Sequence, residues 1–159
     1  MLKIKIIATG KIKEPALGAM IGEYVKRLGK YCTLGIIEVH DESIPAKEGQ
    51  AVIEKRIHAE AVRILERLKP DSYVIALDVG GDAPDSNAFA QKLGGLTGRY
   101  VETAFIIGGS HGLHESVLAR ADYVMSMSNL TFPHQMARLI IMEQIYRAFK
   151  ILSKETYHK

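Results

Sequence analysis

Short apolar runs alternate along the chain with segments whose apolar residues recur at every third or fourth position. The runs predict strands over residues 2–8, 34–39, 73–77, 103–107 and 123–127. The helical spacing predicts helices over residues 15–28, 53–68, 87–96 and 133–154. Pro15 marks the start of the first helix and Pro70 follows the second. A further helix is expected between the last two strands.

The predicted strands are mostly continuous apolar runs, without the regular polar alternation of a sheet that has one wet face. Continuous apolar strands separated by helices are typical of a mostly parallel sheet with helices on both faces. We therefore predict an α/β fold. The sequence shows no internal repeat, low-complexity tract or linker, so residues 1–159 are expected to form one domain, with residues 41–49 as its softest loop.

Composition limits the class of protein without deciding it. Hydrophobic residues make up 47% of the chain, which is enough for one filled core. The lone Cys32 excludes an intramolecular disulfide, and no stretch approaches the roughly 20 apolar residues that span a bilayer. A cytoplasmic protein without membrane contact is expected. The net charge of +3 does not by itself indicate a nucleic-acid partner.

Basic residues gather at both ends of the chain. They are Lys3, Lys5, Lys11 and Lys13 at the start, and Arg138, Arg147, Lys150, Lys154 and Lys159 at the end. A one-sided basic surface would attract a polyanion, although surface lysines also serve solubility. The last predicted helix is apolar around most of its circumference. Part of it is expected to pack on a second subunit, and a deeply buried central helix is the alternative.

The loops that follow three of the strands hold most of the candidate chemistry, because parallel sheets bind ligands at the carboxyl ends of their strands. These loops are residues 78–81, 108–114 and 128–134. The first two are rich in glycine, which lets the backbone approach a ligand closely but also serves tight turns. The third mixes small polar and apolar residues, which would suit either an ordinary loop or the wall of a site for a flat adenine ring.

A serine hydrolase is the main rival interpretation, because the segment from Gly108 to Gly112 matches a Gly-x-Ser-x-Gly nucleophile elbow around Ser110. Asp122, followed by His134 or His158, has the expected order of acid and base. However, Asp122 stands at the start of a strand, which is the wrong edge of the sheet. No Gly-x-Gly-x-x-Gly follows the first strand, and the histidines lack a metal-binding signature, so neither a dinucleotide nor a metal is expected.

The three loops, the segments at residues 131–138 and 143–148, and the ending Tyr157-His158-Lys159 resemble the large-subunit rRNA pseudouridine N3-methyltransferase family of the SPOUT superfamily. The resemblance covers essentially the whole chain. It implies a C-terminal trefoil knot formed by the Gly108 loop and residues 127–132, and a homodimer. It also implies S-adenosylmethionine as cofactor, and as substrate a pseudouridine in helix 69 of 23S rRNA within the assembled ribosome. The residues that it assigns to the cofactor are Leu77, Gly108, Met127, Ser128, Asn129, Leu130, Thr131 and Phe132.

Methyl transfer to N3 of a pseudouridine requires alignment of the methyl group and removal of one proton. The candidates for substrate contact and proton handling are His134, Arg138, Tyr157, His158 and Lys159. His134 as a helix cap and the last three residues as a frayed tail are the alternatives. Phosphate contacts are expected from Arg138, Arg147, Lys150 and Lys154. A non-catalytic ribosome-binding module is a further alternative function.

Overall fold

Strands and helices alternate along the computed structural model, which describes residues 1–42 and 47–157. The strands are β1 (Leu2–Thr9), β2 (Cys32–Val39), β3 (Ser72–Asp82), β4 (Glu102–Ile107) and β5 (Tyr123–Met125). The helices are α1 (Pro15–Leu28), α2 (Gln50–Leu65), α3 (Ser86–Gly95), α4 (Glu115–Arg120) and α5 (His134–Leu152). The strands pair in parallel in the order β2-β1-β4-β3-β5. The predicted α/β fold with a mostly parallel sheet is confirmed.

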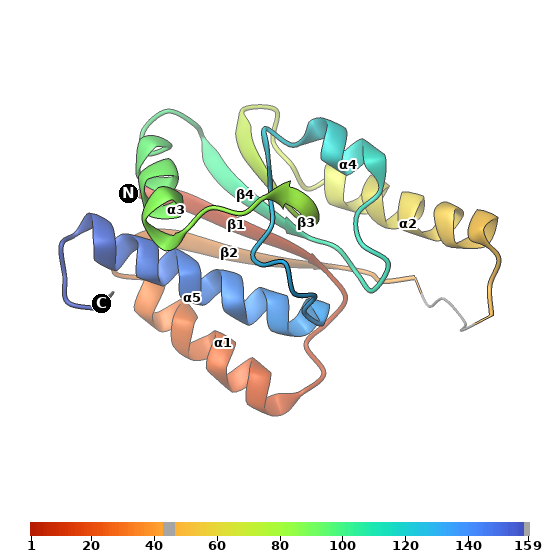
Figure 1. Cartoon of the computed structure of the whole chain (residues 1–159), viewed down its shortest axis with the longest axis horizontal. Coiled ribbons are helices and arrows are strands. Elements are labelled where there is room, and N and C mark those ends of the chain that lie inside the picture. Colours follow the sequence, from red (N-terminus) through yellow and green to blue (C-terminus); the bar gives the residue numbers. More distant parts are fainter. Residues whose placement is uncertain (43–46, 158–159) are drawn as a thin grey trace.

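Helices cover both faces of the sheet (Figure 1). One apolar cluster packs α1, α3 and α5 against one face, and a smaller cluster packs α2 and α4 against the other. Successive residues of β4 point to opposite clusters, so that Phe105 joins the first and Ile106 the second. Every residue of β4 is buried. This burial on both faces explains why the sequence shows continuous apolar runs rather than alternation.

The last helix, α5, lies against the sheet with α1 and α3 packed beside it (Figure 1). Ile141, Met142 and Ile145 are completely buried within the single protomer. Packing inside one chain therefore explains most of the apolar circumference of this helix, whereas Met136 and Leu152, near its two ends, remain 44% and 42% exposed. The buried part of α5 gives no independent evidence for a second subunit.

The strand β3 is longer than predicted, because it continues past Leu77 to Asp82. Leu77 and Asp82 both pair with Met125 of β5, so the residues between them bulge out of the ladder. A Cβ atom on Gly81 would lie 2.6 Å from the backbone of Val124. Gly81 is therefore needed where two strands approach each other, rather than only to turn the chain into a loop.

Candidate functional site

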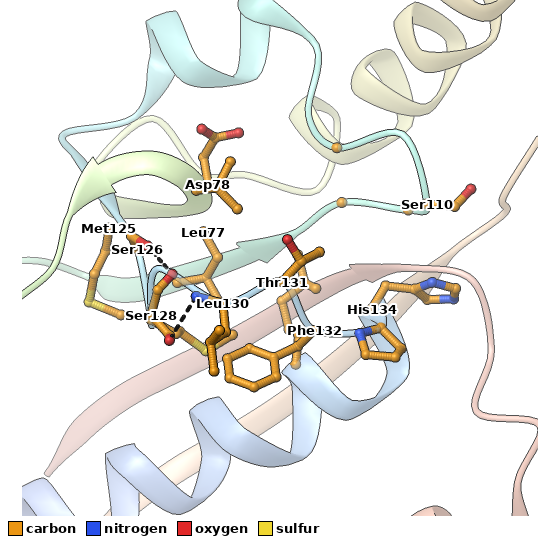
Figure 2. Close-up of a pocket in the computed structure, with 18 of the residues that line it drawn as sticks. Leu77, Asp78, Ser110, Met125, Ser126, Ser128, Leu130, Thr131, Phe132 and His134 are labelled. Atoms are coloured by element: carbon orange, nitrogen blue, oxygen red, sulfur yellow. Dashed lines mark hydrogen bonds between the residues drawn. The ribbon is translucent and has the colours of Figure 1, made fainter.

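A cavity of about 830 Å³ opens at the carboxyl ends of β3, β4 and β5, where the loops after these strands meet the start of α5. Figure 2 shows the side chains that these loops place around it. Its lining residues are Leu77, Asp78, Val79, Ile107, Gly108, Gly109, Ser110, His111, Gly112, Met125, Ser126, Met127, Ser128, Leu130, Thr131, Phe132, Pro133, His134 and Ala137. Small-molecule sites usually enclose roughly 300–1,000 Å³, so the cavity has the size of a cofactor site.

The cavity brings together the residues that the sequence assigns to a cofactor, with one difference. Leu77 and Gly108 line it together with Met127, Ser128 and residues 130–132, whereas Asn129 is not among its lining residues. The sequence interpretation did not assign some neighbouring residues to the cofactor, such as Asp78 and Met125. Their position next to the assigned residues was the only available signal, because no pattern shows which side chain of an irregular loop faces a cavity.

The loop after β4 owes its shape to glycines. A Cβ atom on Gly108 would lie 2.6 Å from the carbonyl oxygen of Gly112. Gly112 has a φ of +79°, which favours glycine, and its N–H donates to the carbonyl of Gly109 at 3.1 Å. The loop therefore closes on itself as a tight backbone turn. Gly108 is needed because a side chain there would prevent the turn from closing. The closed turn then allows a ligand to approach the backbone.

Serine side chains hold the loop after β5 in place. The Ser126 hydroxyl donates to the carbonyl of Ser128 at 2.9 Å, and the Leu130 N–H donates to the Ser128 hydroxyl at 3.0 Å (Figure 2). These bonds fix a turn that leaves the Leu130 side chain 71% exposed. Phe132 lies against the larger apolar cluster. The loop thus presents an apolar wall on one side of the cavity and an uncovered apolar side chain at its rim.

His134 is the first residue of α5 and lines the cavity. The N-cap of α5 is Pro133, and no side chain caps this helix end, so the alternative of a capping histidine is wrong. Burial lowers the pKa of His134 below its ordinary value of 6.5. The positive charges of Arg138 and Lys13 lower this pKa further, while Asp41 acts in the opposite direction. The imidazole is therefore neutral at pH 7 and has a ring nitrogen available to accept a proton.

Arg138 lies in the interior rather than at a surface. Its residue is only 1% exposed, its guanidinium forms an ion pair with Glu38, and it donates to the carbonyl of Gly10 at 2.8 Å. The expectation that Arg138 contacts RNA phosphates is not met in this protomer. Arg138 instead ties the start of α5 to the ends of β1 and β2.

Tyr157 folds back onto α5 at a distance from the cavity. The Tyr157 hydroxyl donates to Glu143 at 3.2 Å, and the Tyr157 ring packs edge-on against Tyr146. The guanidinium of Arg147 lies over the Tyr157 ring. Burial is the main cause that raises the pKa of Tyr157 to about 12. Tyr157 is therefore packed and not frayed. His158 and Lys159 lie outside the described residues.

Asp122 does not take the place of the acid in a serine-hydrolase triad. This carboxylate accepts from the Val74 N–H at 2.8 Å and pairs with Arg120 at the amino edge of the sheet. Ser110 has only His111 as a side-chain partner among the described residues, at 3.1 Å. A nucleophile elbow requires strained backbone at the serine. Ser110 does not have a positive φ, because Lys154 is the only described non-glycine residue that does.

The described residues also contain no group of three or more potential metal ligands. Within the same part of the chain, no helix is long and apolar enough to pass through a bilayer.

The comparison with known families identifies the class of protein. A family model described as "Predicted SPOUT methyltransferase" matches residues 2–158, so the chain belongs to the SPOUT methyltransferase family. Membership indicates that the protein transfers methyl groups. It also implies a trefoil knot, which the sequence resemblance assigns to the loops that form the cavity.

Proposed function

We propose that this protein uses S-adenosylmethionine to methylate N3 of a pseudouridine in helix 69 of 23S rRNA, acting as a homodimer on the assembled ribosome. One observation carries the proposal. In a chain of the SPOUT methyltransferase family, the loops assigned to the cofactor meet at one cavity of suitable size. The substrate is taken from the sequence resemblance and is the part that experiments must test.

The residues around the cavity fit this cofactor. Leu77, Met125 and Phe132 offer apolar surface for an adenine ring, while the tight turn from Gly108 to Gly112 presents backbone groups without Cβ atoms in the way. When bound, S-adenosylmethionine supplies a methyl group that is already activated for transfer. The protein then needs only to align the two reactants and to remove one proton.

His134 is the group best placed to accept that proton. It lines the cavity, and its lowered pKa keeps the imidazole neutral at pH 7. In the transfer step the bond between the methyl carbon and the sulfonium sulfur would break and leave S-adenosylhomocysteine, while the methyl carbon bonds to N3. The N3 proton would pass to the imidazole, so that His134 acts as the general base. Asp41 is close enough to raise the His134 pKa electrostatically, and it would stabilise the imidazolium that results.

A second subunit would explain how the C-terminal tail takes part. Tyr157 packs against Tyr146, which lies about 18 Å along α5 from His134 at roughly 1.5 Å per residue. Tyr157 is therefore remote from the cavity of its own chain. Leu130 lines the cavity and is 71% exposed, and Met136, two residues after His134 on α5, is 44% exposed. These uncovered apolar side chains support a homodimer in which a partner covers the rim.

The decisive test is mass spectrometry of 23S rRNA from cells that lack the protein. We expect one pseudouridine of helix 69 to lose a single methyl group. Purified protein with methyl-labelled S-adenosylmethionine should restore it on 70S ribosomes from those cells. Unchanged rRNA would reject the substrate. Ribosome binding without transfer of label would instead favour the non-catalytic module, and labelling of Ser110 by a fluorophosphonate would favour the hydrolase.

Deletion of the last three residues separates the roles of cavity and tail. The truncated protein should bind S-adenosylmethionine as the full chain does, because Tyr157 lies outside the cavity. It should lose methyl transfer to ribosomes if Tyr157, His158 and Lys159 contact the substrate. Full residual transfer would remove the tail from the mechanism.

A further inference from the structure

The basic residues of α5 are largely neutralised within the protomer. Arg138 pairs with Glu38, Arg147 pairs with Glu143 at 2.7 Å, and Lys150 pairs with Glu155. RNA that bound these cations would have to compete with carboxylates already in contact. If the protein acts on RNA, as its proposed function states, the phosphates near the cavity must meet other cations.

Two lysines in the loop between β1 and α1 meet this requirement. Lys11 and Lys13 are exposed, and neither forms an ion pair with any described residue. Ile12 between them is partly buried against the larger apolar cluster. With the intervening side chain directed inward, the two ammonium groups are presented to solvent.

The backbone of this loop is fixed rather than free. Gly10 donates to the carbonyl of Val39 at 2.9 Å, and the Ile12 N–H donates to Glu38 at 3.3 Å. The Lys13 N–H donates to the side-chain oxygen of Gln135 at 2.9 Å. Ordering costs at binding are reduced when the main chain is already held in place. The loop therefore resembles a prepared surface more than a mobile segment.

The same contacts place the loop beside the candidate active site. Gln135, which holds Lys13, directly follows His134, and Figure 2 shows the chain leaving β1 close to the labelled His134. The charge of Lys13 is also near enough to act on the His134 imidazole. A nucleotide whose base entered the cavity would thus bring its flanking phosphates toward this loop.

We propose that Lys11 and Lys13 bind the RNA phosphates next to the methylated nucleotide and so position the substrate. The cations of α5 are less suited to this role because they already pair with carboxylates. This inference rests on the proposed function. Their contribution is electrostatic, since an ammonium group contacts a phosphate as a point charge. The contribution should therefore decrease as salt increases.

The test compares Lys11→Gln/Lys13→Gln with the wild type in methyl transfer to 70S ribosomes from cells lacking the protein. At about 0.1 M KCl we expect KM to increase roughly tenfold with little change in kcat. The slope of log(kcat/KM) against log[KCl] should become less steep by about 1.4–1.8, the value for two lost phosphate contacts. Affinity for S-adenosylmethionine, measured by calorimetry, should not change.

Two further variants make the result specific. Lys26→Gln/Lys55→Gln removes the same charge from exposed positions on α1 and α2 and should leave KM within about twofold. Lys11→Arg/Lys13→Arg keeps both charges and should behave as the wild type. The inference is overturned if Lys11→Gln/Lys13→Gln has the KM and salt slope of the wild type, or if the control variant changes equally. An inactive wild type, by contrast, would refute the proposed function itself.

Discussion

The two edges of the sheet differ in how their polar groups are used. At the amino edge, Glu102 is 5% exposed and receives bonds from Lys5 at 2.8 Å and Ser72 at 3.0 Å. Asp122 is likewise bound by Arg120 and by a backbone N–H. At the carboxyl edge, glycine turns and loop side chains instead surround an open cavity.

This difference shows how one sheet separates stability from binding. The carboxylates of Glu102 and Asp122 at the amino edge are satisfied inside the protomer. The carboxyl edge exposes Val79 and Leu130, which are 72% and 71% exposed, and places a neutral histidine beside the cavity. Changes at the carboxyl edge should therefore alter binding and transfer, while changes at the amino edge should alter stability.

The largest effect is expected from Gly108→Ala. The new Cβ would overlap the carbonyl of Gly112, so the turn must open and the cavity wall must move. Affinity for S-adenosylmethionine should fall at least about 100-fold, equivalent to about 2.7 kcal/mol. Calorimetry measures this, with Gly22→Ala as the control because its Cβ meets no atom within 4 Å. Unchanged affinity in Gly108→Ala would show that the turn does not shape the cofactor site.

His134→Ala should reduce methyl transfer about 100-fold while S-adenosylmethionine still binds, since a general base contributes roughly 10²–10⁴-fold. In the wild type, transfer should reach half of its maximal rate below pH 6.5, because the pKa of His134 is lowered from that value. It should fall at lower pH as the imidazole, whose pKa is lowered, becomes protonated. Single-turnover rates across pH test this. His58→Ala is the control, and an identical pH profile in His134→Ala would exclude the imidazole as base.

At the amino edge, Glu102→Ala should lower the free energy of unfolding by about 2 kcal/mol, because Lys5 and Ser72 lose a buried partner. Burial alone would raise the pKa of Glu102, but Lys5, Ser72 and Lys69 outweigh it and lower this pKa below 4.5. The carboxylate therefore contributes stability above pH 4.5 that is lost as pH falls through the lowered pKa.

Urea unfolding at neutral and acidic pH measures this contribution, and Glu66→Ala serves as a control at an exposed carboxylate. Cofactor affinity should not change in Glu102→Ala. A large loss of affinity would contradict the separation of the two edges.

The smallest effect is expected from Tyr157→Phe, which removes a hydroxyl that donates to Glu143. The loss of stability should be at most about 1 kcal/mol. Because the folded pKa is raised from 10 to about 12, the hydroxyl contributes stability below pH 10 that is lost as pH rises toward 12. An ultraviolet titration should lose its most alkaline tyrosine in this variant but not in Tyr100→Phe. If Tyr157→Phe abolished transfer, its hydroxyl would act on the substrate.

The positions of the elements could be predicted well from the sequence, and their packing less well. The apolar run at residues 103–107 predicted β4 within one residue, because a strand buried on both faces must be apolar throughout. The extension of β3 to Asp82 was missed, since Gly80 and Gly81 are also typical of a turn. Most assigned cofactor residues line the cavity, but the burial of Arg138 depends on Glu38, a hundred residues away in the chain.

The sequence by itself determined the alternation of strands and helices, the parallel sheet and the loops at strand ends, because these depend on local apolar spacing and on glycine. Only the tertiary structure decided which polar groups are already paired. It placed Arg138 in the interior, buried most of the apolar surface of α5 within one protomer, and left Lys11 and Lys13 exposed with no ion-pair partner among the residues that the structure describes. The reason is that the availability of a charge depends on its neighbours in space, which residues far apart in the chain provide.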